Sequence, residues 1–284
     1  MTGGYSVKEN KINYGIDYQR DMANKYRNRN SNHWKSRIEL AQNLIEKYVL
    51  AKHTGKSKED IVVVDVGCSI GTFAIECAKL GYKSYGIDFD MSAIDLAKQL
   101  SIEENVMPDF VCGDISDWST KFPPIDIAIC FDIFEHLHDD ELASFLSSIR
   151  KQLSDKGTLV FHTYPTEYAY IFYGRRSVSY PLFPFSNISQ PMFNKIVNIY
   201  SCIIDIMLLF KTGKTYKGKI KNSAHCNPTS RERLAEILKR TGYEVDFMEV
   251  SNLYNIDSAV QKRFHKQPIT FINLYGVAIP KPTI

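Results

Sequence analysis

Short apolar runs alternate along the chain with stretches in which apolar residues recur at helical spacing. Runs of this kind, flanked by helices, are typical of strands buried on both faces of a sheet. The pattern therefore predicts an α/β fold, with a parallel sheet covered by helices on both sides. The five strands expected in its parallel part are 61–66, 83–88, 109–114, 126–132 and 157–163.

Two helices and two more strands are predicted outside these five strands. Residues 33–50 carry the apolar pattern of an amphipathic helix, and 229–242 carry that of a second helix, which ends at Gly242. The last two apolar stretches, 243–250 and 270–279, are spaced as a closing antiparallel pair. The complete sheet is thus expected to be seven-stranded and mostly parallel.

The composition changes between the fifth strand and the last helix. Residues 170–221 hold eight Lys or Arg against one acid, a net charge of +7, and ten of these 52 residues are Tyr or Phe. We interpret this aromatic and basic region, bounded at 166–224, as a lid insertion. Its apolar stretch Ile196–Phe210 is expected to be a buried lid helix, whose 15 residues are too few to span a bilayer. The alternative is peripheral contact with a membrane interface, because lysines follow the stretch.

The overall composition limits the class of protein. With 44% apolar and 24% charged residues among 284, the sequence has the balance of a folded globular protein. The net charge of +3 argues against a nucleic-acid partner bound over the whole surface. Six cysteines form no C-x-x-C pair, and the first residues lack a signal-peptide pattern. We therefore expect a reducing, cytoplasmic location.

The motif DVGCSIG, residues 65–71, follows the first strand and precedes a helix. Gly67 and Gly71 allow the backbone to turn sharply and approach a ligand, while the helix start offers unpaired N–H groups. Asp88 ends the second strand, where a carboxylate can accept both hydroxyls of a ribose. The dinucleotide spacing G-x-G-x-x-G is absent, because Ser69 stands where its middle glycine belongs. Loop and acid together indicate a nucleoside ligand.

This motif resembles the first motif of the class I S-adenosylmethionine-dependent methyltransferases, and the resemblance extends over residues 60–165 through GID, GDISDW and CFDIFEHLHD. It implies a Rossmann-like fold with S-adenosylmethionine as cofactor. The division that we expect is an N-terminal cofactor-covering helical segment (1–55), a methyltransferase core (56–165 and 225–284) and the lid (166–224). The cofactor contacts that the resemblance implies are Tyr18, Arg37, Asp65, Gly67, Cys68, Gly71, Asp88, Phe89, Asp114, Ile115 and Phe131.

Two of these residues, Arg37 and Asp114, have alternative roles that involve no cofactor. Arg37 is expected to pair with the cofactor carboxylate, or else to lie solvated on its helix. Asp114 is expected beside the adenine, or else it caps the end of a strand. Tyr14 belongs to the same covering segment, and Arg175 is a candidate for binding a phosphate or carboxylate of the acceptor.

The segment DIFEH, residues 132–136, follows the fourth strand. It resembles the E-x-x-E-H segment of the ubiquinone-biosynthesis O-methyltransferases and of the small-RNA 2′-O-methyltransferases, with an aspartate replacing the first glutamate. The resemblance implies a divalent metal such as Mg²⁺, held by Asp132, Glu135 and His136 with His225 as a fourth ligand. The alternative is that Glu135 caps or orients the following helix.

His136, His162 and His225 are the candidate catalytic bases, because a neutral imidazole can take the proton from an attacking hydroxyl. For His162 the alternative is a hydrogen-bonded residue at the end of a strand. The expected reaction is O-methylation of a small-molecule, sugar or glycan-precursor acceptor. Three alternatives stay open: an RNA 2′-O-methyltransferase, a catalytically silent cofactor-binding scaffold, and a nicotinamide dehydrogenase, which the loop spacing opposes.

Overall fold

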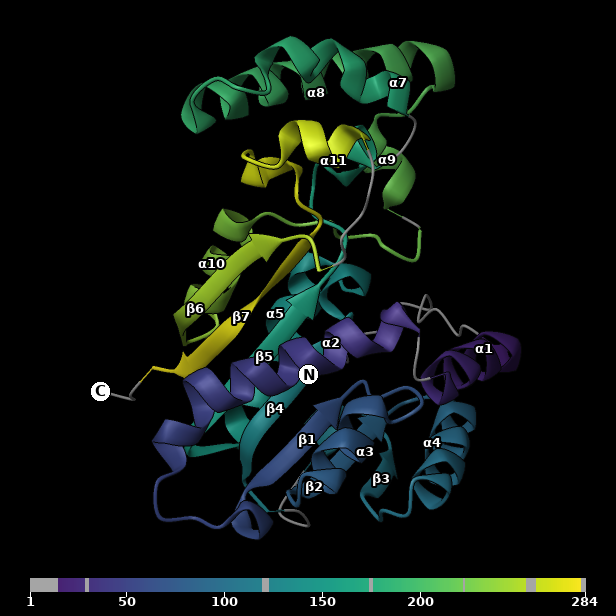
Figure 1. Cartoon of the computed structure of the whole chain (residues 1–284), viewed down its shortest axis with the longest axis vertical. Helices are drawn as coiled ribbons and strands as arrows, with labels where there is room; N and C mark the ends of the chain where they lie inside the picture. Colours follow the sequence, from purple (N-terminus) through teal and green to yellow (C-terminus); the bar gives the residue numbers. More distant parts are fainter. Residues whose placement is uncertain are drawn as a thin grey trace, which may run out of the picture.

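A single sheet organises the chain. The computed structural model describes residues 15–28, 31–118, 123–173, 176–221, 223–253 and 259–281. Within this part of the chain, seven strands form one sheet in the order β3-β2-β1-β4-β5-β7-β6 (Figure 1). The strands are β1 Val62–Val66, β2 Lys83–Asp88, β3 Asp109–Cys112, β4 Ile125–Phe131, β5 Leu153–Thr163, β6 Tyr243–Ser251 and β7 Asn273–Pro280.

The pairing of the strands confirms the predicted sheet. β1 pairs in parallel with β2 and β4, β2 with β3, and β4 with β5. β7 pairs antiparallel with both β5 and β6, which is the predicted closing pair. The chain runs outward from β1 to β3 and then returns to β4 on the other side of β1. A crevice at the carboxyl ends of β1 and β4 is the usual ligand position in such a sheet.

Helices cover both faces of the sheet. α2, the π-helical turn η1 and α3 contribute to one apolar cluster, and α5 and α10 contribute to the cluster on the opposite face. α1 packs with α4 and Ile70 in a smaller cluster. The helices are α1 Gly15–Arg27, α2 Asn32–Leu44, η1 Ile45–Val49, α3 Thr72–Lys79, α4 Met91–Glu103, α5 Asp139–Gln152, α6 Ala169–Phe172, α7 Arg176–Ser179, α8 Gln190–Thr212, α9 Tyr216–Ile220, α10 Arg231–Arg240 and α11 Ala259–Phe264.

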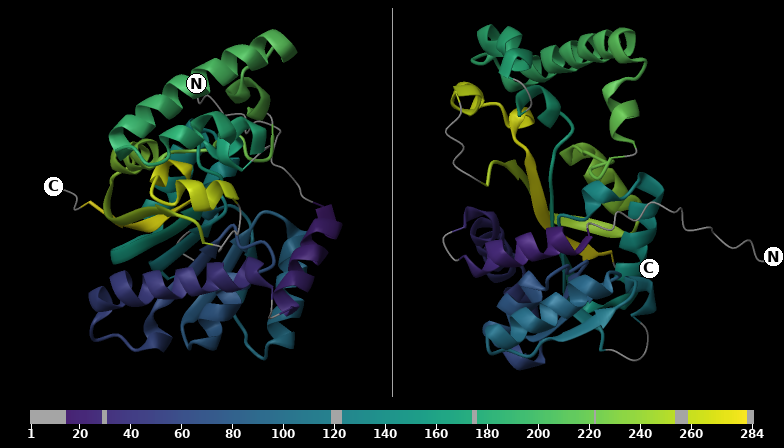
Figure 2. Two further views of the ribbon diagram at one scale, coloured as in Figure 1. Left: turned by 45° about the horizontal axis from the view of Figure 1, so that its top comes forward. Right: turned by 90° about the vertical axis from the view of Figure 1, so that its right-hand side faces the viewer.

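The residues between β5 and α10 form a separate layer, which we call the cap. It contains α6 to α9 and the 3-10 turn η6 (Tyr180–Phe185), and α11 from the β6–β7 connection packs into it. The cap has its own apolar cluster around Phe172, Phe193 and Phe264. It lies beyond the carboxyl ends of the parallel strands, with α8 farthest from the sheet (Figures 1 and 2).

The prediction of a short, buried lid helix is wrong. α8 is 23 residues long, and in its most apolar window only 11% of the residues are buried. Periodicity predicts a helix but does not say whether a partner covers it, and here only Phe193 and Val197 are buried. Among the described residues, α8 is the one helix whose length and apolarity suffice to cross a membrane, and it is eight residues longer than the 15 predicted.

Candidate functional site

The loop between β1 and α3 carries the predicted glycine turn. Gly67 and Gly71 have φ values of 72° and 78°, in the left-handed region that favours glycine. A Cβ atom at Gly67 would lie 2.6 Å from Cδ1 of Ile133, and one at Gly71 would lie 2.6 Å from the Phe110 ring. Space and backbone conformation therefore both require glycine, and the contact with Ile133 brings this loop beside the segment that follows β4.

Asp88 lies against the same loop, as the sequence predicts. Its carboxylate oxygens accept hydrogen bonds from the N–H groups of Ser69 (2.8 Å) and Asp90 (2.9 Å). Burial raises the pKa of this carboxyl. The Phe89 N–H is a further backbone partner of this carboxylate. The arrangement therefore holds the acid in a fixed orientation at the carboxyl end of β2.

The start of α3 completes this cradle. Its N-cap, Gly71, supplies no side-chain cap. The buried Thr72 Oγ1 has no hydrogen-bond partner among the described residues. Asp65 points to the same helix and accepts from the N–H of Ala74 at 3.3 Å, and burial raises the pKa of its carboxyl to about 7. A tight glycine turn beside an unpartnered buried hydroxyl fits a ligand held against backbone.

The remaining predicted cofactor residues differ in exposure. Cys68 is buried in the loop, and Phe131 is buried at the end of β4 against Phe73, with ring centroids 4.7 Å apart. Phe89 is 47% exposed. Asp114 accepts from the N–H and Oγ of Ser116, as the capping alternative predicts. Ile115, in the short turn after β3, belongs to the sheet core.

The N-terminal segment contacts the glycine loop directly. Gln19 of α1 is buried and accepts a hydrogen bond from Ser69 Oγ at 2.7 Å. The Tyr18 side chain is partly exposed, and burial, followed by the charge of Asp132, raises the pKa of its hydroxyl. Tyr14 and Arg175 lie outside the described residues.

A buried polar chain connects α2 to the sheet at the end of β4. Arg37 Nε donates to Asp132 Oδ2 at 2.6 Å, and Asp132 Oδ1 lies 2.6 Å from His162 Nδ1. The other ring nitrogen of His162 lies 2.9 Å from Asn273 Oδ1. Burial alone would raise the pKa of Asp132, but the positive charges of His162 and Arg37 outweigh it and hold that pKa below its ordinary value.

These hydrogen bonds give three of the predicted site residues roles other than the predicted ones. The Asp132 carboxylate is engaged by Arg37 and His162, and the group of possible ligands in the described part of the chain is Glu135, His136 and His225, without Asp132. His162 is fully buried with both ring nitrogens engaged, which is its hydrogen-bonded alternative and leaves no nitrogen for an acceptor proton. Arg37 binds Asp132 and the carbonyl oxygen of His33. It is not solvated, since it is only 6% exposed.

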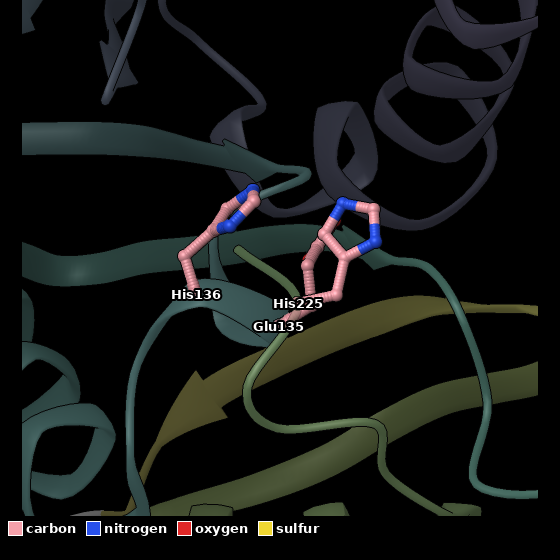
Figure 3. Close-up of side chains that lie close together, drawn as sticks. All are labelled: Glu135, His136 and His225. Atoms are coloured by element: carbon pink, nitrogen blue, oxygen red, sulfur yellow. The ribbon is translucent and has the colours of Figure 1, made fainter. Parts of the chain in front are cut away.

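Glu135, His136 and His225 do come together (Figure 3). The imidazole rings of His136 and His225 have centroids 5.1 Å apart and extend to the same side from the η5 turn (Phe134–His136) and from the segment before α10. His136 Nδ1 lies 2.6 Å from the carbonyl oxygen of Ala224. A carbonyl only accepts, so Nδ1 carries the proton of the neutral ring. Burial lowers the pKa of both imidazoles, which favours their neutral form.

The three side chains provide donors of the kind that hold a divalent cation. Their ligand atoms lie within 4.8 Å of one another. In an octahedral Mg²⁺ site, neighbouring ligand atoms are about 3.0 Å apart and opposite ones about 4.2 Å, and at most one pair among three ligands can be opposite, so the three side chains would have to move closer together. Glu135 is buried, accepts from Thr163 Oγ1 at 2.8 Å, and has its pKa raised by burial and by the charge of Asp132. The donor set fits a metal with His225 in the place predicted for Asp132.

Several supporting residues were missed by the sequence analysis. Asn227 donates its backbone N–H to the carbonyl oxygen of Glu135 (3.0 Å) and its side-chain amide to that of Leu137 (2.6 Å). It thereby fixes the segment that carries His225 against η5. The polar Asn227-Pro228 pair before a helix was the available signal. Gln19 and Asn273 gave none, because their partners are remote in the sequence.

Comparison with known proteins agrees with this geometry. A family model described as a methyltransferase domain matches residues 33–246. The ubiquinone biosynthesis O-methyltransferase of Coxiella burnetii is 29% identical over 117 residues, which are 41% of this chain and 48% of that protein. The corresponding protein of Rickettsia bellii is 26% identical over 104 residues. The chain thus spans about half the length of the curated relatives that it matches.

Solved structures share the fold. The plantazolicin methyltransferase BpumL, in complex with SAH, aligns with a TM-score of 0.54 and 16% identity over 93% of this chain and 90% of that one. The magnesium protoporphyrin IX methyltransferase of Synechocystis PCC 6803, with bound SAH, aligns with a TM-score of 0.51 and 14% identity over 87% and 84%. With the family model covering most of the residues, the chain belongs to the class I S-adenosylmethionine-dependent methyltransferase family.

Proposed function

We propose that this protein transfers the methyl group of S-adenosylmethionine to a hydroxyl oxygen of a small-molecule acceptor. The observation that carries the proposal is a juxtaposition at one edge of the sheet. The glycine loop and Asp88, at the ends of β1 and β2, adjoin the segment after β4 that bears His136. A nucleoside cradle and an imidazole base therefore lie on neighbouring elements.

The residues have distinct roles in this reaction. Asp88 accepts the ribose hydroxyls, and the glycine loop lies against the amino-acid part of the cofactor. The bound cofactor supplies a methyl group already activated on a sulfonium sulfur. The acceptor oxygen bonds to that methyl carbon, the carbon–sulfur bond breaks with its electron pair left on sulfur, and His136 Nε2 takes the hydroxyl proton. His136 is suited to this role because its Nδ1–H is held by Ala224.

The cap supports an acceptor with an aromatic or otherwise planar part. Tyr164 lies edge-on to His225 with centroids 5.9 Å apart, and Tyr170 stacks on Tyr216 at 3.8 Å. The Tyr164 ring thus flanks the histidine pair, and the Tyr170–Tyr216 stack joins α6 to α9 within the cap. A sugar or glycan precursor stays our first choice of acceptor class, because polar hydroxyls and ring faces are both recognised by such a surface.

Labelled transfer tests the proposal. The protein is incubated with methyl-tritiated S-adenosylmethionine and a small-molecule fraction of cell extract, and in parallel with total RNA from the same cells. We expect label in the small-molecule fraction and its loss in Asp88→Ala. Label in RNA, with binding that falls steeply with salt, would establish the RNA 2′-O-methyltransferase instead. Cofactor binding without any transfer would establish the silent scaffold.

A further inference from the structure

The outward face of α8 is apolar and exposed. Ile199 is 63% exposed and Phe210 is 87% exposed, and Ile203 and Ile206 lie between them. At 3.6 residues per turn these four side chains fall within a sector of about 60°. We call them the outer stripe of α8. Met192, Met207 and Leu209, on the same helix, are exposed as well.

The opposite face of α8 is anchored in the cap. Phe193 and Val197 are fully buried, and the Phe193 ring lies 5.5 Å from that of Phe264 in α11. Tyr200 donates its hydroxyl proton to the carbonyl oxygen of Val178 at 2.7 Å. The helix is therefore held firmly by one side while the outer stripe faces away from the protein.

Positive charge adjoins the outer stripe. Lys211, at the end of α8, is followed by four further lysines through residue 221, and all five are exposed. None of the five makes a salt bridge with a carboxylate in the described part of the chain. The single acid of α8, Asp205, is turned toward α9, where it accepts from the N–H of Tyr216 at 2.9 Å. We call 211–221 the basic segment.

These features select one partner. A second copy of the chain would bring two basic segments together, and their charges would repel. A helix spanning the bilayer would place Lys195 and Asp205 in hydrocarbon and would withdraw Phe193 from the cap core. A helix lying in the plane of an anionic membrane surface keeps the anchored face in place, buries the outer stripe and pairs the lysines with headgroups.

We propose that the outer stripe of α8 and the basic segment form a docking surface for bilayers that contain anionic lipid. The cap lies beyond the carboxyl ends of the strands, so docking through α8 turns those strand ends toward the membrane with the rest of the cap between them (Figure 2). The proposal goes beyond the proposed function. Because its test measures binding alone, its outcome is independent of whether methyl transfer occurs.

Vesicle co-sedimentation tests the docking surface. The full chain is mixed with two kinds of vesicle. One kind is phosphatidylcholine alone, and the other contains about 30% phosphatidylglycerol, which gives it a negative surface charge like that of a cytoplasmic leaflet. We expect binding to the anionic vesicles that is at least about tenfold stronger and that weakens with salt. Replacing Lys214 and Lys219 by Gln should weaken it about fivefold for each lysine.

Matched variants distinguish binding through the outer stripe from non-specific hydrophobic binding. The double change Ile203→Asp and Phe210→Asp should abolish binding to anionic vesicles. Its control, Ile102→Asp with Met107→Asp, also removes two apolar side chains, which are 74% and 96% exposed, and adds two negative charges away from the cap. The control should bind as the natural chain does. Circular dichroism verifies that both variants stay folded, as expected for exposed positions.

Three outcomes would overturn the proposal. The first is no binding to either kind of vesicle. The second is a dimer in sedimentation velocity that the Ile203→Asp, Phe210→Asp change disrupts, without vesicle binding, which would make this face an interface between copies. The third is association with membranes that resists high salt and alkaline carbonate, which would make α8 a spanning helix.

Discussion

At the scale of single residues, Asp88 and Asp65 lie near the same loop but have different partners. Asp88 accepts from the Ser69 N–H of the loop and is the predicted ribose ligand, whereas Asp65 accepts from the Ala74 N–H of α3. Replacing Asp88 by Ala removes a charged hydrogen-bond acceptor, so S-adenosylmethionine binding should weaken by about 1.5–3 kcal/mol, or about 10- to 150-fold in Kd. Calorimetry measures this, with the exposed Asp95→Ala as control; equal affinities for the two variants would contradict the assignment.

The raised pKa of Asp65 predicts how the free energy of unfolding depends on pH. Its pKa in the folded protein is about 7, against about 4 for an unfolded aspartate, so its contribution to stability is complete below about pH 4 and is lost as the pH rises through 7. The free energy of unfolding of the natural chain, relative to that of Asp65→Asn, should fall by about 3–4 kcal/mol between pH 4 and pH 8. Urea unfolding at each pH measures it. A difference that does not change with pH would show that Asp65 stays ionised.

His136 and His225 are distinguished by kinetics at saturating acceptor. His136→Ala should lower kcat by about 10²–10⁴-fold with little change in KM, because a base acts in the transition state. His225→Ala should affect KM more than kcat if this residue lines the acceptor pocket. Equal kcat values for both variants and the natural chain would remove the imidazoles from the chemistry.

At the scale of elements, the η5 turn and the segment before α10 together decide whether a metal is used. If Glu135, His136 and His225 hold Mg²⁺, His136 Nε2 is a metal ligand rather than the base, and exhaustive chelation should abolish turnover that added Mg²⁺ restores. Direct titration of Mg²⁺ should then show one site that His225→Ala removes. Full turnover after chelation would leave the three residues as a proton-handling and structural cluster.

The elements also show how far the sequence pattern reaches. All seven strands and the helix ending before Gly242 were predictable, because their apolar residues face the sheet core directly. The glycine loop and Asp88 were predictable because turn, strand end and helix start are local. The chain from Arg37 through Asp132 to His162 was not, since it joins residues 95 and 30 positions apart. The exposure of α8 was not predictable either, because the spacing of apolar residues is the same for a buried helix face and for an exposed one.

At the scale of the whole molecule, the cap and the sheet have separate cores. Phe264 is fully buried among Phe172, Phe183 and Phe193, with ring centroids 5.2 to 5.5 Å away. Phe264→Ala should cost about 3–5 kcal/mol of packing within the cap. Hydrogen exchange should therefore accelerate in α8 while β1 and β4 stay protected.

A matched change in the sheet is the control for this prediction. Phe161 is equally buried, but it belongs to the sheet core on β5. Phe161→Ala should accelerate exchange in the strands as well as in the cap. Uniform acceleration in both variants would show that the two cores unfold as one cooperative unit.

The β6–β7 connection reaches into the cap through α11, so the cap is built from two stretches of chain rather than one inserted piece. A chimera that takes only the stretch between β5 and α10 from a relative would replace Phe172 and Phe193, on which Phe264 packs, and would leave Phe264 in place. Recombination that preserves the fold must therefore move both stretches together. An engineered exchange of the cap therefore carries the hairpin that closes the sheet along with it.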